Sequence, residues 1–516
     1  MHSHSAFCTR HSTFLSLAII LSIAAGLRVA RITYGSLSFD EIWHLELSTG
    51  RGSPHVRVPE NQLIPNAPDV TSLRGGDVPP FYAVWSHMDF VVHPPLYVTL
   101  LRLWRDVFGD GDVAARSYSI LCSLVAIAFM FLAARELSGA LVALCAAAMY
   151  AAAPTQIFIA QQVRGYDQLA AFGMAAVFCL VRLEMGRGSI PRNAIALGVC
   201  TLGMMLSHYF AAGACAAIGV YVLIRLRGRT LRVALAALLA SAVMFLVIWG
   251  PFLWKQRTYF AQTADVWLME RTPDHLINTV GRLFSWCWWL IVREPSPSTP
   301  IAMLSGLLLI IPPIAIVLRR RYELLLWYLW LLGTLGFVAS LDFVRSTSHL
   351  RYERYVSLAS PAVFVLLAAM AARLPPKMPK NIWMIVPACV VAISLYNWRL
   401  AYVTEGEPDW RQLGFDIDQS VRPGETIIFY PGTQPKWYIE IFYLAASHYS
   451  HAFPRPIIKL SAPATPELVS QIPGNSAWMV SGSLNRSHDP AQILPGVTVV
   501  EQHGYPTLTH IELPPR

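Results

Sequence analysis

The sequence predicts a polytopic α-helical membrane protein that carries a small α/β domain at its C-terminal end. Hydrophobic residues make up 55% of the 516 residues and charged residues only 14%, a balance typical of membrane proteins. The apolar residues gather in runs of about 20, the length at which a helix crosses a bilayer. After residue 400, Pro, Gly, Ser and charged residues return. We therefore expect a membrane domain over 1–400 and an extracytoplasmic α/β domain over 401–516.

Eleven apolar runs are candidate membrane spans. The first run lacks a small-residue cleavage site, so we interpret it as a retained span rather than a signal peptide. The fifth run is short. It and the sixth would form one span if the helix continued through the polar break at Ser207-His208-Tyr209. The approximate limits of the runs are 13–33, 113–133, 139–158, 166–184, 193–207, 208–224, 232–251, 300–318, 323–341, 356–372 and 381–400.

The basic residues indicate which side of the membrane each linker faces. With this span count, their clusters all fall on one side, which the positive-inside rule makes cytoplasmic. The opposite side then receives the first loop 34–112, the loops 252–299 and 342–355, and the tail. The net charge of +9 is thereby explained by topology, and no nucleic-acid partner is expected. The clusters are Arg135; Arg182, Arg187 and Arg192; Arg225, Arg227, Arg229 and Arg232; Arg319, Arg320 and Arg321; and Arg373, Lys377 and Lys380.

The tail has the pattern of a small folded domain. Short apolar runs at 426–430, 478–481 and 497–500 predict buried strands, and 409–420 and 464–472 predict short helices. These strands carry too much apolar surface for a disordered tail.

Several kinds of site are not predicted. The eight cysteines form no CxxC pair, and six of them lie inside apolar runs, so they indicate buried hydrophobic side chains. The sequence has no Gly-rich phosphate loop, no HExxH and no serine elbow. No cofactor is certain from the sequence. A divalent cation stays an open alternative, although no set of ligands for it stands out.

Two adjacent carboxylates, Asp40 and Glu41, follow the first span in the sequence SFDEIWH. A carboxylate at the membrane surface is within reach of a lipid-borne donor and of a polar acceptor, and it can act as a general base. Adjacent helical residues point about 100° apart, so the two would have different roles. The alternative is an acidic first turn behind an N-cap at Ser38 or Asp40.

Polar groups recur at the outer ends of later spans. His93 precedes two prolines that fix its backbone, and it could bind phosphate or orient an acceptor. Arg164 is well placed to bind a lipid phosphate, with Tyr166 and Asp167 beside it as substrate-binding candidates. The alternatives are an incidental histidine at a helix start and a snorkelling arginine with an interfacial tyrosine.

The outer loop 342–355 is strongly basic, against the positive-inside bias. Phosphate binding is the simplest interpretation, and the alternative is pairing with Asp342, Glu353 or acidic groups of the tail. Lys255, after the seventh span on the same side, is a further candidate for the donor phosphate. The basic and aromatic candidates of the loop are Arg345, His349, Arg351, Arg354 and Tyr355.

These motifs together resemble those of the GT-C membrane glycosyltransferases. The most similar group is related to protein O-mannosyltransferases and to the bacterial aminoarabinose transferase that modifies lipid A. The resemblance covers about residues 13–400, and residues 51–92 depart from it because they are rich in Pro, Gly and His. It is carried by the acidic pair after the first span, HisProProLeu at 93–96, ArgGlyTyrAsp at 164–167, ArgTyr at 354–355 before Pro361, and AspTrpArg at 409–411.

The resemblance implies a GT-C fold and an inverting hexosyl- or pentosyltransferase. The implied donor is a polyprenyl-phosphate sugar, and the acceptor is an envelope glycan, lipid or protein on the outer face of the cell inner membrane. Asp40 would be the general base, and Glu41 would orient a neighbour or help to hold a cation. Arg164 and Arg354 would bind the donor phosphate, and Tyr355 would contact substrate.

Two other classes of function are weighed against this one. A transporter or flippase of lipid-linked sugars would place polar residues near the bilayer midplane and show inverted repeats. The polar residues here concentrate at the outer ends of the spans. A non-catalytic envelope scaffold would not require acidic and basic groups on one face.

Overall fold

The computed structural model of the chain describes residues 2–74, 78–88, 91–259, 268–270, 272–293, 300–372, 382–402, 408–432, 434–482, 493–503 and 506–515. The chain divides into two compact units. Unit 1 contains Met1–Ile32, Asp89–Tyr97 and Arg116–Val403, and unit 2 contains Thr33–Met88, Val98–Ala115 and Thr404–Arg516. Residues of the first loop therefore fold with the tail.

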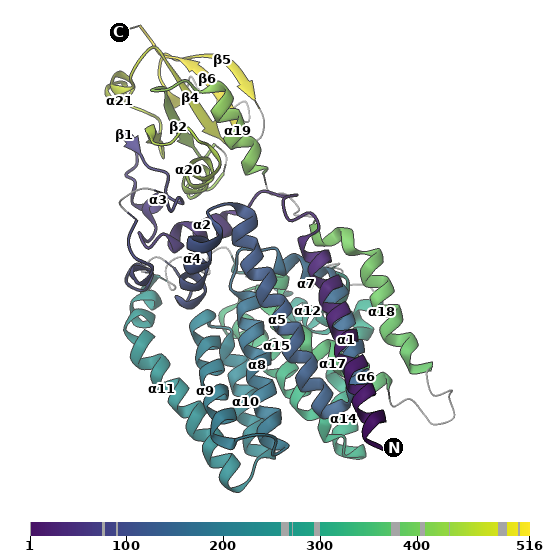
Figure 1. Ribbon diagram of the computed structural model, residues 1–516. Coiled ribbons are helices and arrows are strands. Elements are labelled where there is room, and N and C mark those ends of the chain that lie inside the picture. The colour runs from purple at the N-terminus through teal and green to yellow at the C-terminus, as the bar shows by residue number, and fades with distance from the viewer. Residues whose placement is uncertain are drawn as a thin grey trace. The chain divides into compact units, whose positions relative to one another are not determined.

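Unit 1 is helical (Figure 1). Its longer helices are α1 (His2–Val29), α5 (Asp112–Ser138), α6 (Ala140–Ala152), α8 (Tyr166–Glu184), α9 (Ile190–Ser207), α10 (Ala211–Arg225), α11 (Gly228–Tyr259), α12 (His275–Val292), α14 (Leu307–Arg319), α15 (Leu325–Arg345), α17 (Ser360–Ala371) and α18 (Ile385–Tyr396). Shorter helices are α7 (Pro154–Ala160), α13 (Pro300–Ser305), η4 (Tyr322–Leu324), η5 (His349–Arg351), α16 (Glu353–Val356), η6 (Ser357–Ala359), η7 (Ile382–Met384) and η8 (Trp398–Tyr402).

The predicted spans coincide with apolar helices. Among the described residues, eight helices are long and apolar enough to cross a membrane, and the pair α6 and α7, which is bent by 64°, makes a ninth if it is counted as one broken span. Shorter apolar helices at Ala211–Arg225 and Ile382–Tyr396 lie at the remaining two predicted runs. The predicted polytopic helical class is therefore confirmed.

Two glycines allow α10 and α15 to approach closely. A Cβ atom on Gly213 would overlap the carbonyl oxygen of Gly333, and one on Gly333 would overlap that of Gly213. Small residues at such crossings are how helices in membranes gain van der Waals contact. Near this crossing α10 begins directly after Phe210, whose ring lies 6.1 Å from that of Phe337 on α15.

Gly213→Ala is expected to destabilise the protein by about 2–3 kcal/mol, since the methyl group overlaps backbone that cannot move aside. Gly219→Ala is the matched control on the same helix. A Cβ atom added to Gly219 would meet no described atom within 4 Å, and alanine is the better helix former, so stability should be unchanged or slightly higher. Thermal unfolding in detergent measures both variants. Equal stability of the two would contradict this packing.

Unit 2 contains a mixed sheet with helices on both faces (Figure 1). In the described residues the strand order is β1-β3-β2-β4-β6-β5, with β2, β3 and β4 parallel. The strands are β1 (Leu63–Ala67), β2 (Thr426–Tyr430), β3 (Arg455–Lys459), β4 (Ser476–Ser481), β5 (Thr498–His503) and β6 (Thr507–Glu512). The helices are α2 (Phe39–Ser48), α3 (Pro54–Arg57), η1 (Phe81–Ser86), α4 (Leu96–Phe108), α19 (Trp410–Ser420), α20 (Tyr438–Tyr449) and α21 (Pro466–Gln471).

The central strand β2 is buried on both faces, which explains why its sequence is apolar without alternation. Ile428 belongs to a core that includes Leu468 and Val469 of α21. Phe429 points the other way and meets the ring of Tyr443 on α20 at 5.7 Å. The predicted strands at 426–430, 478–481 and 497–500 and both predicted helices are confirmed. The edge strand β1 comes from the first loop and pairs antiparallel with β3, which local patterns did not predict.

Candidate functional site

Asp40 and Glu41 lie in unit 2, in the first turn of α2, and their surroundings differ. Oε2 of Glu41 accepts hydrogen bonds from the backbone nitrogen and the hydroxyl of Ser38, both at 2.9 Å. This is a capping box, and Glu41 is 4% exposed. Asp40 is half-buried, and its backbone oxygen is 2.6 Å from Nδ1 of His44. The helix-cap alternative thus accounts for Glu41 and leaves Asp40 as the stronger candidate base.

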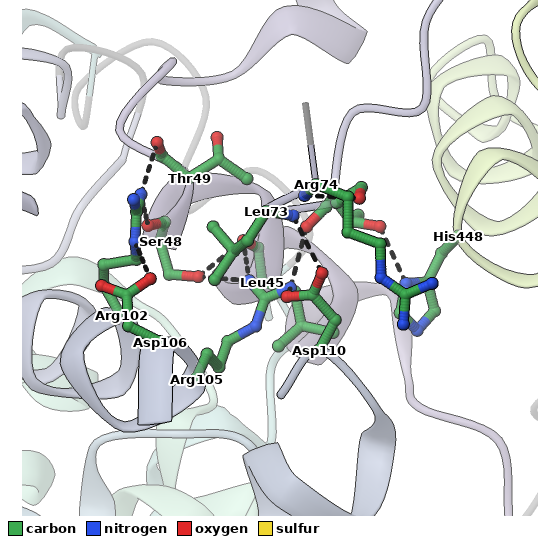
Figure 2. Close-up of polar contacts among 12 residues, drawn as sticks. Leu45, Ser48, Thr49, Leu73, Arg74, Arg102, Arg105, Asp106, Asp110 and His448 are labelled. Carbon is green, nitrogen blue, oxygen red and sulfur yellow. Dashed lines mark hydrogen bonds and ion pairs between the residues drawn. The ribbon is translucent and has the colours of Figure 1, made fainter. Parts of the chain in front are cut away.

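Arg105 of α4 holds the other end of α2 (Figure 2). It donates to the carbonyl of Leu45 at 2.8 Å and to Oγ of Ser48 at 2.5 Å. Its second terminal nitrogen donates to the carbonyl of Thr71 at 2.8 Å and to Oδ1 of Asp110 at 3.0 Å. Burial lowers the pKa of Arg105 to about 10, so the guanidinium stays charged at neutral pH. A cation at this end also stabilises the helix dipole.

Arg102 makes a second, more exposed attachment to the end of α2 (Figure 2). It donates to the carbonyls of Ser48 at 3.2 Å and Thr49 at 2.9 Å, and it pairs with Asp106 at 2.8 Å. The two arginines of α4 therefore satisfy carbonyls that the end of a helix leaves unpaired. The orientation of the helix that carries Asp40 depends on this support.

Arg105→Met is expected to destabilise unit 2 by about 3 kcal/mol, because it leaves several buried acceptors without their donor. Asp106→Asn is the control, since its side chain is 41% exposed and an exposed pair contributes less than about 1 kcal/mol. The measurement is the rate of proteolysis within residues 33–88 of the protein in detergent. Similar rates for the two variants would contradict the supporting role of Arg105.

In unit 1, the rings of His93 and Tyr166 lie close to that of His208, and Arg164 contacts Tyr166. The rings of His93 and Tyr166 lie 5.0 Å and 5.1 Å from that of His208. A terminal nitrogen of Arg164 donates to the Tyr166 hydroxyl at 3.3 Å, and its guanidinium carbon is 5.6 Å from the tyrosine ring. Gly165 leaves room for the neighbouring Tyr97, because a Cβ at position 165 would lie only 3.3 Å from Cβ and Cγ of that side chain.

Arg354 and Tyr355 are connected to His208 through the ring of Phe210. The ring of Phe210 lies 4.8 Å from His208 and 5.2 Å from Tyr355. The guanidinium carbon of Arg354 is 5.2 Å from the ring of Tyr355. A continuous series of ring contacts therefore joins Arg164 to Arg354, although 190 residues separate them in the sequence (354 minus 164).

The remaining groups of the basic loop 342–355 are partly used within the fold. Asp342 accepts from the backbone nitrogen of His349 at 2.8 Å and lies 2.9 Å from its Nδ1. Glu353 pairs with Arg293 at 3.2 Å. Arg351 is exposed. The pairing alternative therefore accounts for His349, whereas Glu353 pairs with Arg293, which lies outside the loop.

Asp167 and Lys255 have contrasting surroundings. Asp167 is 2% exposed and bonds to Ser123, which also accepts from Nε of the fully buried Arg28 at 3.0 Å. These contacts place Asp167 inside unit 1, and its substrate-binding role stays a prediction. Lys255 is exposed near the end of α11, with Nζ 5.9 Å from the ring of Phe252.

The structure adds residues that the sequence patterns did not single out. His208, Tyr209 and Phe210 form the whole connection between α9 and α10, and the available signal was a polar break in an apolar run. Among the described residues, no group of three or more His, Cys, Asp or Glu side chains is placed to hold a metal ion.

Comparison with known proteins gives one family model and several related folds. The model for dolichyl-phosphate-mannose-protein mannosyltransferase matches residues 92–254. ArnT from Cupriavidus metallidurans bound to undecaprenyl phosphate is similar with a TM-score of 0.54 and 14% sequence identity, over 96% of this chain and 97% of that one. Its apo structure is similar with a TM-score of 0.55 and 14% identity, over 98% of each chain. None of the curated protein sequences matches the chain significantly.

These comparisons confirm the resemblance to GT-C membrane glycosyltransferases and the predicted fold class. The similarity to ArnT extends over nearly the whole length of both chains, so it includes the small sheet-containing part as well as the membrane helices. At 14% identity it shows the shared fold. The family match covers His93 and the segment Arg164–Asp167.

Proposed function

We propose that this protein is a membrane glycosyltransferase that moves a sugar from a polyprenyl-phosphate donor to an acceptor of the cell envelope. The observation that carries the proposal is the series of contacts that joins Arg164, Tyr166, His208, Phe210, Tyr355 and Arg354 in unit 1. It gathers two cations and several polar rings at the ends of apolar helices. The undecaprenyl phosphate bound to the similar ArnT structure supports a lipid phosphate as the ligand.

The proposed reaction is a single displacement that inverts the anomeric carbon of a hexosyl or pentosyl unit. The acceptor oxygen forms a bond to that carbon, and the bond from the carbon to the phosphate oxygen breaks. The electron pair leaves with the phosphate, which gains one negative charge, and the acceptor proton passes to Asp40. Arg164 and Arg354 stabilise the charge that develops on the phosphate.

The other candidate residues have supporting roles in this proposal. His93, Tyr166 and Tyr355 contact substrate, while the exposed Lys255 and Arg351 attract the anionic donor. The acceptor is an envelope glycan, lipid or protein, and transfer takes place on the outer face of the cell inner membrane. We place unit 2 on that same outer side.

Proteoliposomes that contain lipid-linked sugars extracted from the producing cells test the proposal. A transferase releases free polyprenyl phosphate and glycosylates an added envelope acceptor, and Asp40→Asn stops both. A flippase instead moves the lipid-linked sugar between leaflets and leaves it intact. Translocation without any release of polyprenyl phosphate would overturn the transferase proposal.

A further inference from the structure

Trp249, Tyr209 and Gln256 form a chain of hydrogen bonds that ends on the backbone of His93, all within unit 1. Nε1 of Trp249 donates to the Tyr209 hydroxyl oxygen at 2.8 Å. The Tyr209 hydroxyl donates to Oε1 of Gln256 at 2.5 Å. Nε2 of Gln256 donates to the carbonyl oxygen of His93 at 3.3 Å. Trp249 is fully buried and Gln256 is 3% exposed, while Tyr209 between them is half-buried.

The chemistry of the groups fixes the direction of this chain. An indole nitrogen can only donate, so the tyrosine oxygen must accept from it. The tyrosine proton is then available for the amide oxygen of Gln256, and the amide NH₂ is left to face His93. Successive bonds that run in one direction polarise and strengthen one another. Loss of the tyrosine hydroxyl would therefore release the orientation of the glutamine as well.

The His93 segment needs a partner of this kind. Pro94 and Pro95 follow it, and neither has a backbone N–H with which to attach the segment to its surroundings. The carbonyl of His93 provides an acceptor instead. Fixing this carbonyl also fixes the backbone from which the imidazole projects, and that ring lies 5.0 Å from the ring of His208.

We propose that Tyr209 and Gln256 are positioning residues, which hold His93 at the angle that the transfer reaction requires. Tyr209 stands between His208 and Phe210, the two residues through which the contacts from Arg164 to Arg354 pass. The same three-residue turn thus joins the phosphate-binding residues and orients the histidine. This inference rests on the proposed function, because it assumes that His93 contacts substrate.

Tyr209→Phe tests the inference, with Tyr221→Phe as the matched control. Tyr221 lies on α10, is 1% exposed and donates its hydroxyl to Glu184 at 2.5 Å. Each variant therefore loses a donated hydrogen bond of 2.5 Å, and Tyr209→Phe also loses the bond from Trp249. Tyr209→Phe should lower kcat about tenfold, which is typical for a buried donor that is lost, and change the KM for the donor less than about twofold. Tyr221→Phe should leave kcat unchanged.

Hydrogen exchange of the peptide that covers residues 91–99 provides a readout that does not depend on activity. Tyr209→Phe and Gln256→Leu should each speed exchange there, and the double variant should add little to either single one because the bonds act as a unit. Unchanged exchange in Tyr209→Phe would show that Tyr209 does not hold the His93 segment in position, whatever the protein's activity. Faster exchange with an unchanged kcat would overturn its role in the reaction. A wild-type protein without transferase activity would instead overturn the proposed function.

Discussion

Asp40→Asn is expected to lower kcat by about 10³-fold, because the variant keeps the size of the side chain and loses the group that accepts the proton. The fold should survive, since the capping box that starts α2 is made by Ser38 and Glu41. Binding of undecaprenyl phosphate should be unchanged, because the phosphate is assigned to other residues. The measurement is the initial rate of transfer in proteoliposomes, alongside a thermal-shift assay with undecaprenyl phosphate.

Asp409→Asn is the matched control for this experiment. Asp409 is exposed in the same unit and caps α19 by accepting from the backbone nitrogens of Arg411 and Gln412. Asparagine caps a helix as well as aspartate does, so both activity and stability should be retained. A transfer rate in Asp40→Asn close to that of Asp409→Asn would show that Asp40 is not the base.

Replacing either Arg164 or Arg354 by Gln is expected to lower kcat/KM by about 10²-fold, the loss expected when one partner of a buried, charged contact is removed. Arg164→Lys should recover only part of the loss, because an ammonium cannot reproduce the planar fork of donors. If both arginines hold one phosphate, the double variant should deviate from additivity, as neighbours that share a partner do. Steady-state kinetics of the four variants with the lipid-linked donor measure these effects.

Two kinds of control accompany the arginine variants. Arg187→Gln removes an arginine whose side chain is 57% exposed and is paired with Glu136, and it should have no effect on transfer. Arg351→Gln and Lys255→Gln remove exposed candidates, so their effects should stay below about fivefold. Wild-type kinetics in both Arg164→Gln and Arg354→Gln would contradict the assignment of the donor phosphate to these residues.

The sequence predicted the membrane helices well because each span is a local property of composition. The strands β2, β4 and β5 were also found, since each is a short apolar run that needs no partner to be recognised. The strands β3 and β6 and the helix α20 were not predicted. The edge strand β1 was missed for a different reason, because it lies in the first loop and pairs with β3 almost 400 residues later. Pairing over such a distance leaves no local pattern.

The sequence predicted individual residues of the candidate site, but it did not predict the contacts that join them. His93, Arg164 and Arg354 were each selected for their chemistry at the end of a span. The contacts that join them depend on His208 and Phe210, and those contacts exist only once the helices have packed. The sequence predicted different roles for Asp40 and Glu41, because adjacent helical residues point about 100° apart. It did not predict which of the two carboxylates reaches back to Ser38.

The most direct test of the central claim is an inventory of envelope glycans, lipids and glycoproteins in three strains. One strain carries the wild-type protein, one lacks it, and one carries only the Asp40→Asn form at wild-type abundance. The transferase account predicts that the second and third strains lose the same sugar from the same acceptor and accumulate the same lipid-linked donor. Loss of the sugar in the deletion strain alone, with a normal envelope in the Asp40→Asn strain, would contradict it.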